Sequence, residues 1–206
     1  MTTYYKATQP NGTDFHSGRV DYAAALASGE PVTHPIGNVH SKSTAGYLSV
    51  SVSPTDCTGA AWPCRLFRVE PIGEVGTLGT YPSKRLVAAL RVVEELPAVE
   101  ALGPQGQAIV ALIERARALT LQEVNDLDAA GLAARKAFAS SAAWAVAWAA
   151  AGDAAGDAAR AAAVRDLIGT TFTQEQYDLL TTPWRTAIGR VHPDDADLRT
   201  PAAVTE

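Results

Sequence analysis

The first part of the chain carries short apolar runs separated by turn residues, a pattern that predicts strands. Residues 4–8 form the first such run, and the turn sequence Gln-Pro-Asn-Gly at 9–12 closes it. Residues 14–19 are expected to pair back onto the first strand as a hairpin. Residues 21–28 predict a short helix that ends at Gly29, because glycine readily adopts the left-handed conformation at the C′ position.

Strict alternation marks the next strand, at residues 47–52. Leu48, Val50 and Val52 fall on one face and the residues between them on the other, which predicts a strand buried on one side. The sequence Ser-Pro-Thr-Asp at 53–56 fits an N-cap followed by proline, and so predicts a single helical turn. Strands are also expected at 65–70 and at 90–95, and a helix is the open alternative for the second of these.

From residue 104 onward the apolar positions recur at helical spacing. Apolar residues at i, i+3, i+4 and i+7 from 109 to 116 predict one helix. A capping box formed by Thr120 and Glu123 predicts that a second helix begins near Leu121. The stretch 129–163 holds 20 alanines in 35 residues, and Gly152 and Gly156 within it favour at least two helices there rather than one rod.

A last helix is expected to open around Thr173 and to be broken or restarted at Pro183. The segment that opens it, 172–177, resembles 119–124 in its spacing of apolar residues and threonine. Similar N-caps on two helices explain this likeness, and a duplicated helical hairpin is the alternative. At least three helices are predicted between 104 and 182.

These patterns predict an α+β protein. A small, twisted, mainly antiparallel β domain is expected at 1–103, an Ala-rich helical domain at 104–192, and a polar, frayed tail at 193–206. The length of 206 residues suits one compact domain or two small ones.

Composition narrows the class of protein. Hydrophobic residues make up 47% and charged residues 19%, which excludes a wholly disordered chain. The net charge of -5 and a pI near 5.4 argue against a nucleic-acid-binding surface. The chain contains 40 alanines, and 13 of its 17 basic residues are arginine. This bias towards GC-rich codons suggests an actinobacterium or one of its phages as the source.

No secretory signal is recognisable in the first residues, and the most apolar run, 142–151, has ten residues where a membrane span needs about 20. A cytoplasmic protein without a membrane partner is therefore expected. In that compartment Cys57 and Cys64 are expected to be free thiols.

Two tryptophans dominate the Ala-rich stretch. Trp144 and Trp148 lie four residues apart and so share one helix face. They are expected to be mostly buried in the core of the helical half. The alternative is a stripe that binds a protein partner, because exposed tryptophans often dominate interfaces.

The sequence gives little support for a metal site or a catalytic nucleophile. His34, His40, Cys57 and Cys64 have spacings of H-x5-H and C-x6-C, which match no compact zinc module. Zinc content well below one ion per chain is predicted. The sequence has neither a nucleophile elbow nor a phosphate-binding loop of the P-loop type.

Four segments in the first half carry a resemblance to a known family. They are Tyr-Lys-Ala-Thr at 5–8, Tyr-Leu-Ser-Val-Ser at 47–51, a strand with Val-Glu-Pro-Ile-Gly at 69–73, and Arg-Val-Val-Glu-Glu at 91–95. In their order they resemble the rifampin ADP-ribosyltransferase family over roughly residues 4–96. The whole chain also resembles proteins of actinobacteria and their phages that join such a domain to an Ala-rich helical tail.

The resemblance implies the fold more than the activity. The family's NAD-binding His would fall on Lys6, its Tyr is kept at Tyr47, and its catalytic Asp would fall near Thr77 or Leu78. A lysine cannot replace a neutral histidine as donor and acceptor, and neither Thr77 nor Leu78 supplies a carboxylate. No cofactor is expected, and a degenerate site that takes NAD or an ADP-ribose fragment is the open alternative. Its residues would be Lys6, Thr8, Tyr47, Ser49, Glu70 and Glu74.

Three functional hypotheses follow. The first is a non-catalytic binding or interaction protein, an accessory protein of a phage or one that contacts a host, with an unidentified protein partner. The second is an active ADP-ribosyltransferase-like enzyme that uses NAD. The third is a structural protein that forms homo-oligomers.

Overall fold

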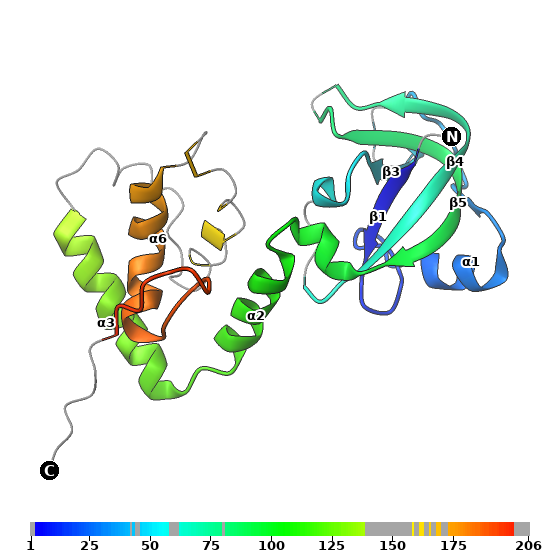
Figure 1. Cartoon of the computed structure of the whole chain (residues 1–206). Coiled ribbons are helices and arrows are strands. Elements are labelled where there is room, and N and C mark those ends of the chain that lie inside the picture. Colours follow the sequence, from blue (N-terminus) through cyan, green and yellow to red (C-terminus); the bar gives the residue numbers. More distant parts are fainter. Residues whose placement is uncertain are drawn as a thin grey trace, which may run out of the picture. The chain divides into compact units, whose positions relative to one another are not determined.

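A computed structural model of the chain describes residues 3–41, 43, 46–57, 62–79, 81–138, 158, 161–162, 165, 168–169 and 173–199; within α3 the side chains at 131 and 133–138 are not described. The chain divides into two compact units, residues 1–103 and 104–206. We call them the β unit and the helical unit (Figure 1). The predicted α+β class is confirmed, since a five-stranded antiparallel sheet is followed by helices.

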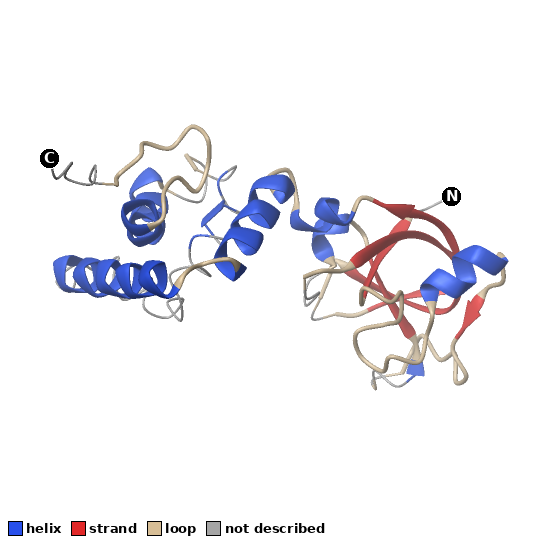
Figure 2. Ribbon diagram, turned by 90° about the horizontal axis from the view of Figure 1, so that it is seen from below, coloured by secondary structure: helices blue, strands red, loops and turns tan. Residues whose placement is uncertain are grey.

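The β unit is built on a sheet that closes on itself. Its strands are β1 (Tyr4–Thr8), β2 (Val32–Thr33), β3 (Leu48–Ser51), β4 (Arg65–Thr77) and β5 (Lys84–Leu96). They lie in the order β2-β5-β3-β1-β4, all antiparallel, and a further pairing of β5 with β4 joins the two sides. Figure 2 shows the strands curving around a common interior.

Large apolar side chains fill this interior. Phe67, Val69, Val87 and Leu90 from the two long strands are fully buried there. Tyr22 joins them from the helix α1 (Tyr22–Ser28), with its ring stacked at 6.4 Å from the ring of Phe67. Because aromatic rings bury large areas, Tyr22 fixes the helix against the sheet.

The predicted strand β1, its turn and the helix α1 are confirmed. Asp21 caps α1 by accepting the backbone N–H of Ala24, and Gly29 ends the helix with φ 74°. The hairpin predicted for 14–19 is wrong, because this segment is a loop. The residues on either side of it, Thr13 and Asp21, form an isolated antiparallel bridge. The carboxylate of Asp14 accepts hydrogen bonds from inside the loop and so takes the place of a strand ladder.

The strand at 47–52 is shorter and more buried than predicted. It covers Leu48–Ser51, and both faces contribute buried side chains, since Tyr47 is 6% exposed and Ser51 2%. The predicted inward position of Val52 is wrong, because it is 38% exposed. Alternation predicts two faces. The core of the closed sheet covers the face of Leu48 and Val50, and Tyr47 packs separately with Val39 and Leu86. The single turn after it, η2 (Pro54–Asp56), is confirmed.

Strands β4 and β5 are each 13 residues long, about twice the predicted lengths. Register shifts interrupt their pairing between Arg68 and Val69 and between Ile72 and Val75. Such irregularities bend the hairpin, which lets the same two strands also pair with β1, β2 and β3. A short helical turn, η3 (Ala98–Leu102), ends the β unit.

The helical unit contains α2 (Gly106–Arg117), α3 (Leu121–Phe138) and α6 (Gln174–Ala187). The three helices predicted between 104 and 182 are confirmed. Both predicted N-termini are also confirmed. The backbone N–H of Thr120 donates to the Glu123 carboxylate, and Thr173 and Gln176 form a full capping box.

Pro183 does not break α6, contrary to the prediction. It lies inside the helix and is buried, with Trp184 beside it at 1% exposure. The hydroxyls of Thr181 and Thr182 donate to the carbonyls of Tyr177 and Asp178, four residues back. Hydroxyl groups bound in this way bend a helix, which makes room for the proline ring. Burial of the surrounding side chains then outweighs the lost backbone hydrogen bond.

The segment after α6 is also not frayed over its described length. Asp195 is buried, and its carboxylate accepts hydrogen bonds from the Arg165 guanidinium at 2.7 Å and the Tyr177 hydroxyl at 2.8 Å. The guanidinium of Arg185 donates to the carbonyl of Ala196. These contacts hold residues 190–199 against the helices, and composition alone did not reveal them.

Trp144 and Trp148 lie outside the described residues, as do residues 200–206. Predictions on those positions remain predictions. Within the described part, no helix is long and apolar enough to cross a bilayer.

Candidate functional site

The β unit contains a cavity of about 1000 Å³. Three parts of the fold line it: the facing strands β1 and β3, the loop at 14–21 with α1, and the segment 30–36. The volume is at the upper end of the range for sites that hold a small organic ligand. The walls are largely apolar, and Lys6 and Tyr22 contribute polar atoms among them.

Lys6 reaches this cavity from the middle of β1. Its ammonium donates one hydrogen bond, to the carbonyl of Ser49 at 3.0 Å, and lies 5.5 Å from the centre of the Tyr22 ring. Desolvation lowers the pKa of Lys6 below its ordinary value; Asp14 opposes the shift, and Lys84 adds to it. An ammonium has three N–H groups, so this one can donate further hydrogen bonds to an incoming acceptor.

Tyr22 places an unpartnered hydroxyl beside the same cavity. The side chain is fully buried, and among the described residues its Oη is the one buried side-chain nitrogen or oxygen without a hydrogen-bond partner. Burial raises the pKa of this phenol, with a smaller contribution from Asp14, so the group is a neutral O–H donor. An unsatisfied buried polar group costs about 1–3 kcal/mol, which an acceptor atom placed here would offset.

Of the positions that the resemblance predicts for the family's functional residues, Lys6, Tyr47 and Leu78 line this cavity. Thr77, the alternative position for the acidic residue, does not line it. Tyr47 is buried and packs with Val39 and Leu86. Leu78 follows the end of β4 and presents an apolar side chain where a carboxylate would be needed.

Asp14 also lines the cavity, although no motif in the sequence identified it as a candidate ligand residue. Its carboxylate accepts the backbone N–H groups of His16, Ser17, Arg19 and Val20 and the hydroxyl of Ser17, at 2.6 to 3.2 Å. Desolvation alone would raise its pKa. The hydrogen bonds from Ser17 and Val20, with the charge of Lys6, outweigh it and lower the pKa to about 2. This carboxylate is committed to the loop and is a poor proton donor or acceptor for a ligand.

Two further carboxylates reach the cavity wall. Asp21 is occupied as the N-cap of α1. Glu30 is exposed on the segment after α1, and within the described part of the chain nothing bonds to its carboxylate. Glu30 is therefore the one acidic side chain of this wall that is not already engaged in the described structure.

The other predicted ligand residues lie away from this cavity. Thr8 is fully buried, and its hydroxyl donates to the carbonyl of Gln9. Glu70 on β4 pairs loosely with Arg68 at 3.8 Å. Glu74 is mostly exposed and contacts His40 at 3.1 Å. The structure thus gathers Lys6, Tyr47 and Ser49 but not these three.

The histidines and cysteines do not gather into a site in the described structure. Cys57 and Cys64 are free and buried, and burial raises the pKa of both thiols. His34 is half-buried and His40 is exposed. No group of three or more potential metal ligands occurs among the described residues.

Comparison with known proteins adds no assignment: no family model matches the chain, and neither a curated protein nor a solved structure does. The resemblance to rifampin ADP-ribosyltransferases therefore stays a prediction from the sequence.

Proposed function

We propose that the β unit is a non-catalytic binding module for a small ligand with a phosphate or other acidic group, of the size of a nucleotide or an ADP-ribose fragment. One observation carries the proposal. Lys6, Tyr47 and Leu78 line the same cavity, which supports a nucleotide-like site with an apolar residue in place of a carboxylate.

Donor groups at this cavity suit an acidic ligand. The Lys6 ammonium has unused N–H groups, and the Tyr22 hydroxyl has no described partner. Both donate to oxygen, and the lowered pKa of Lys6 marks a cation that lacks full compensation. A bound phosphate oxygen would accept further hydrogen bonds from the Lys6 ammonium and restore the pKa of Lys6 towards its ordinary value.

Cleavage of NAD needs a carboxylate near the reacting sugar carbon, because positive charge develops there. Asp14 is held by five hydrogen bonds and Asp21 by the helix N-terminus. An interaction role for the helical unit belongs to the same proposal, although the tryptophans that motivate it lie outside the described residues.

Binding is tested by titrating the full chain with ADP-ribose, AMP and inorganic phosphate in a calorimeter. Lys6→Met keeps the length of the side chain and removes the charge, so we expect at least a tenfold loss of affinity for ADP-ribose, about 1.4 kcal/mol. Arg91→Gln is the matched control, since it removes one positive charge from the exposed part of β5. Equal affinity of Lys6→Met and the wild type would contradict the proposal.

Tyr22→Phe separates the hydroxyl from the ring. Without ligand we expect the variant to be as stable as the wild type or up to about 2 kcal/mol more stable, because an unsatisfied buried hydroxyl is removed while the packing stays. With saturating ADP-ribose the same difference should remain, because the enclosed hydroxyl lies out of the ligand's reach. Thermal unfolding with and without ligand measures both, and a clear loss of stability without ligand would show that the hydroxyl already has a partner.

The enzyme alternative is decided by nicotinamide release from NAD. We expect no release above the uncatalysed rate. Glu30 is the acidic residue on the cavity wall that this alternative would have to use. Turnover that disappears in Glu30→Gln or Tyr47→Phe would favour the enzyme over the binding module.

A further inference from the structure

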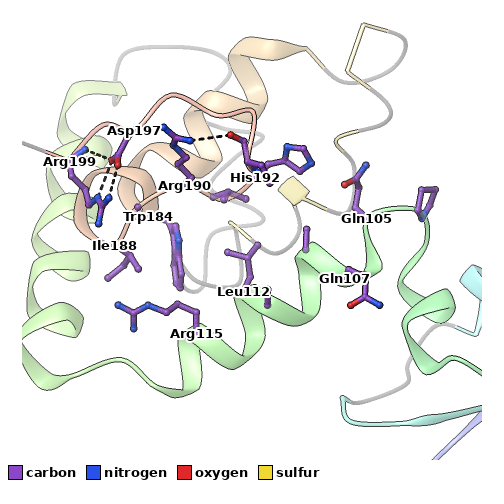
Figure 3. Close-up of a pocket in the computed structure, with 16 residues that line it drawn as sticks. Gln105, Gln107, Leu112, Arg115, Trp184, Ile188, Arg190, His192, Asp197 and Arg199 are labelled. Carbon is purple, nitrogen blue, oxygen red and sulfur yellow. Dashed lines mark hydrogen bonds and ion pairs between the residues drawn. The ribbon is translucent and has the colours of Figure 1, made fainter.

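The helical unit contains a second cavity, of about 960 Å³, between α2, the end of α6 and the segment that follows it (Figure 3). It does not depend on the β unit or on the function proposed above. Its floor is apolar, with Trp184, Leu112 and Val191 each at most 6% exposed. Such a floor suits the aromatic or aliphatic body of a small molecule.

Three arginines stand around this floor, and two of them are neutralised. Arg115 forms an ion pair with Glu123, whose pKa the pair holds well below its usual range. Arg199 forms two hydrogen bonds with Asp197, at 3.0 and 2.6 Å. These partners occupy both guanidinium groups in the described structure, and Figure 3 shows the pair of Arg199 with Asp197.

Arg190 is different. Its guanidinium makes one long hydrogen bond, to the carbonyl of Pro193 at 3.3 Å, and no described carboxylate forms an ion pair with it. The hydrogen bonds from Arg199, with a smaller contribution from the charge of Arg190, lower the pKa of Asp197. It is exposed at the rim of the cavity, with most of its five N–H donors unused. A guanidinium matches the two oxygens of a carboxylate, which it binds in a bidentate manner.

Trp184 supplies a second unused donor. The side chain is 99% buried, since 1% of it is exposed, and none of the described residues accepts a hydrogen bond from its indole N–H. Trp184 lines the cavity, and no described acceptor competes for its indole N–H.

We propose that this cavity is a binding site for a small aromatic or aliphatic carboxylate. The apolar body rests on Trp184, Leu112 and Val191, and the carboxylate is bound by Arg190 at the rim, with the indole N–H as a further donor to an acceptor atom of the ligand. Arg115 and Arg199 line the same cavity, but their ion pairs keep them from competing with Arg190 for the ligand's carboxylate. Arg190 selects for a negatively charged group on the ligand, and the apolar floor selects for an apolar body.

The test is calorimetric titration of the full chain with 2-naphthoate, beside the neutral 2-naphthamide and inorganic phosphate. We expect 2-naphthoate to bind at least ten times more tightly than either. Arg190→Gln should weaken 2-naphthoate at least tenfold, because it removes a charge-assisted pair. Arg117→Gln removes the same charge from the outer face of α2 and should leave the affinity unchanged.

Trp184→Phe keeps an aromatic floor and removes the N–H, so a threefold to tenfold loss of affinity, roughly the value of one neutral hydrogen bond, is expected. If that variant does not fold, the exposed Arg190 still tests the site. Lys6→Met should bind 2-naphthoate normally, which separates this site from the cavity of the β unit. Equal binding of naphthoate and naphthamide, or equal losses in Arg190→Gln and Arg117→Gln, would overturn the proposal.

Discussion

Asp14→Ala is expected to cost the β unit about 3–4 kcal/mol of unfolding free energy. The carboxylate accepts five hydrogen bonds inside one loop and is 6% exposed, so its removal leaves four backbone N–H groups without their acceptor. Hydrogen exchange of the intact chain, followed by mass spectrometry, measures the β unit separately. Peptides covering 14–28 should lose most of their protection, while those covering α3 should not change.

Asp21→Ala is the control, because Asp21 lies at the end of the same loop and accepts one backbone hydrogen bond as a helix cap. It should cost about 1 kcal/mol. Equal effects of the two substitutions would contradict the role of Asp14.

Acid should lower the stability of the β unit by protonating the same carboxylate, that of Asp14. The folded pKa of Asp14 is about 2, below its ordinary value of 3.8, so its contribution is complete above pH 4 and is lost as the pH falls towards 2. The wild type should therefore lose stability over that range more steeply than Asp14→Ala. Parallel pH profiles for the two proteins would contradict the assignment.

Asp195→Ala is expected to cost the helical unit about 3–5 kcal/mol. The side chain is 4% exposed, and it accepts hydrogen bonds from the Arg165 guanidinium, the Tyr177 hydroxyl and the backbone N–H of His192. Removing one partner of a buried ion pair leaves the other charge without compensation. Arg165 also lies 5.1 Å from the centre of the Tyr177 ring, so both groups should lose order together.

The neighbouring residue provides the control. Asp194 is 76% exposed at its side chain and reaches Arg165 at 3.8 Å, so Asp194→Ala should change stability by less than about 0.5 kcal/mol. Protection of peptides from 173 to 199 against hydrogen exchange distinguishes the two. Desolvation alone would raise the pKa of Asp195, but the hydrogen bonds from Tyr177 and Arg165 lower it. The contribution of Asp195 to the free energy of unfolding should therefore also be lost below about pH 4. A loss below 1 kcal/mol in Asp195→Ala would contradict its role.

Local signals determined much of the fold. The strand at 4–8, the cap and glycine stop of α1, and the starts of α3 and α6 all follow from residues within a few positions of one another. Such features depend on backbone geometry and short-range hydrogen bonds, which the sequence specifies directly. The resemblance in the first half also led to Lys6, Tyr47 and Ser49, which line the same cavity.

Long-range packing decided the rest. The long pairing of β4 with β5 doubles the expected strand lengths, and long-range contacts bury side chains on both faces of β3. Alternation within one strand cannot reveal a second covering layer. Pro183 stays helical because its surroundings are buried, and the polar segment after α6 is held by Arg165 and Arg185, 30 and 11 residues away in the chain. Sequence spacing likewise gave no reason to connect Asp14 with Lys6 or Trp184 with Arg190. Those pairs reach one cavity each only because the tertiary structure places their elements side by side.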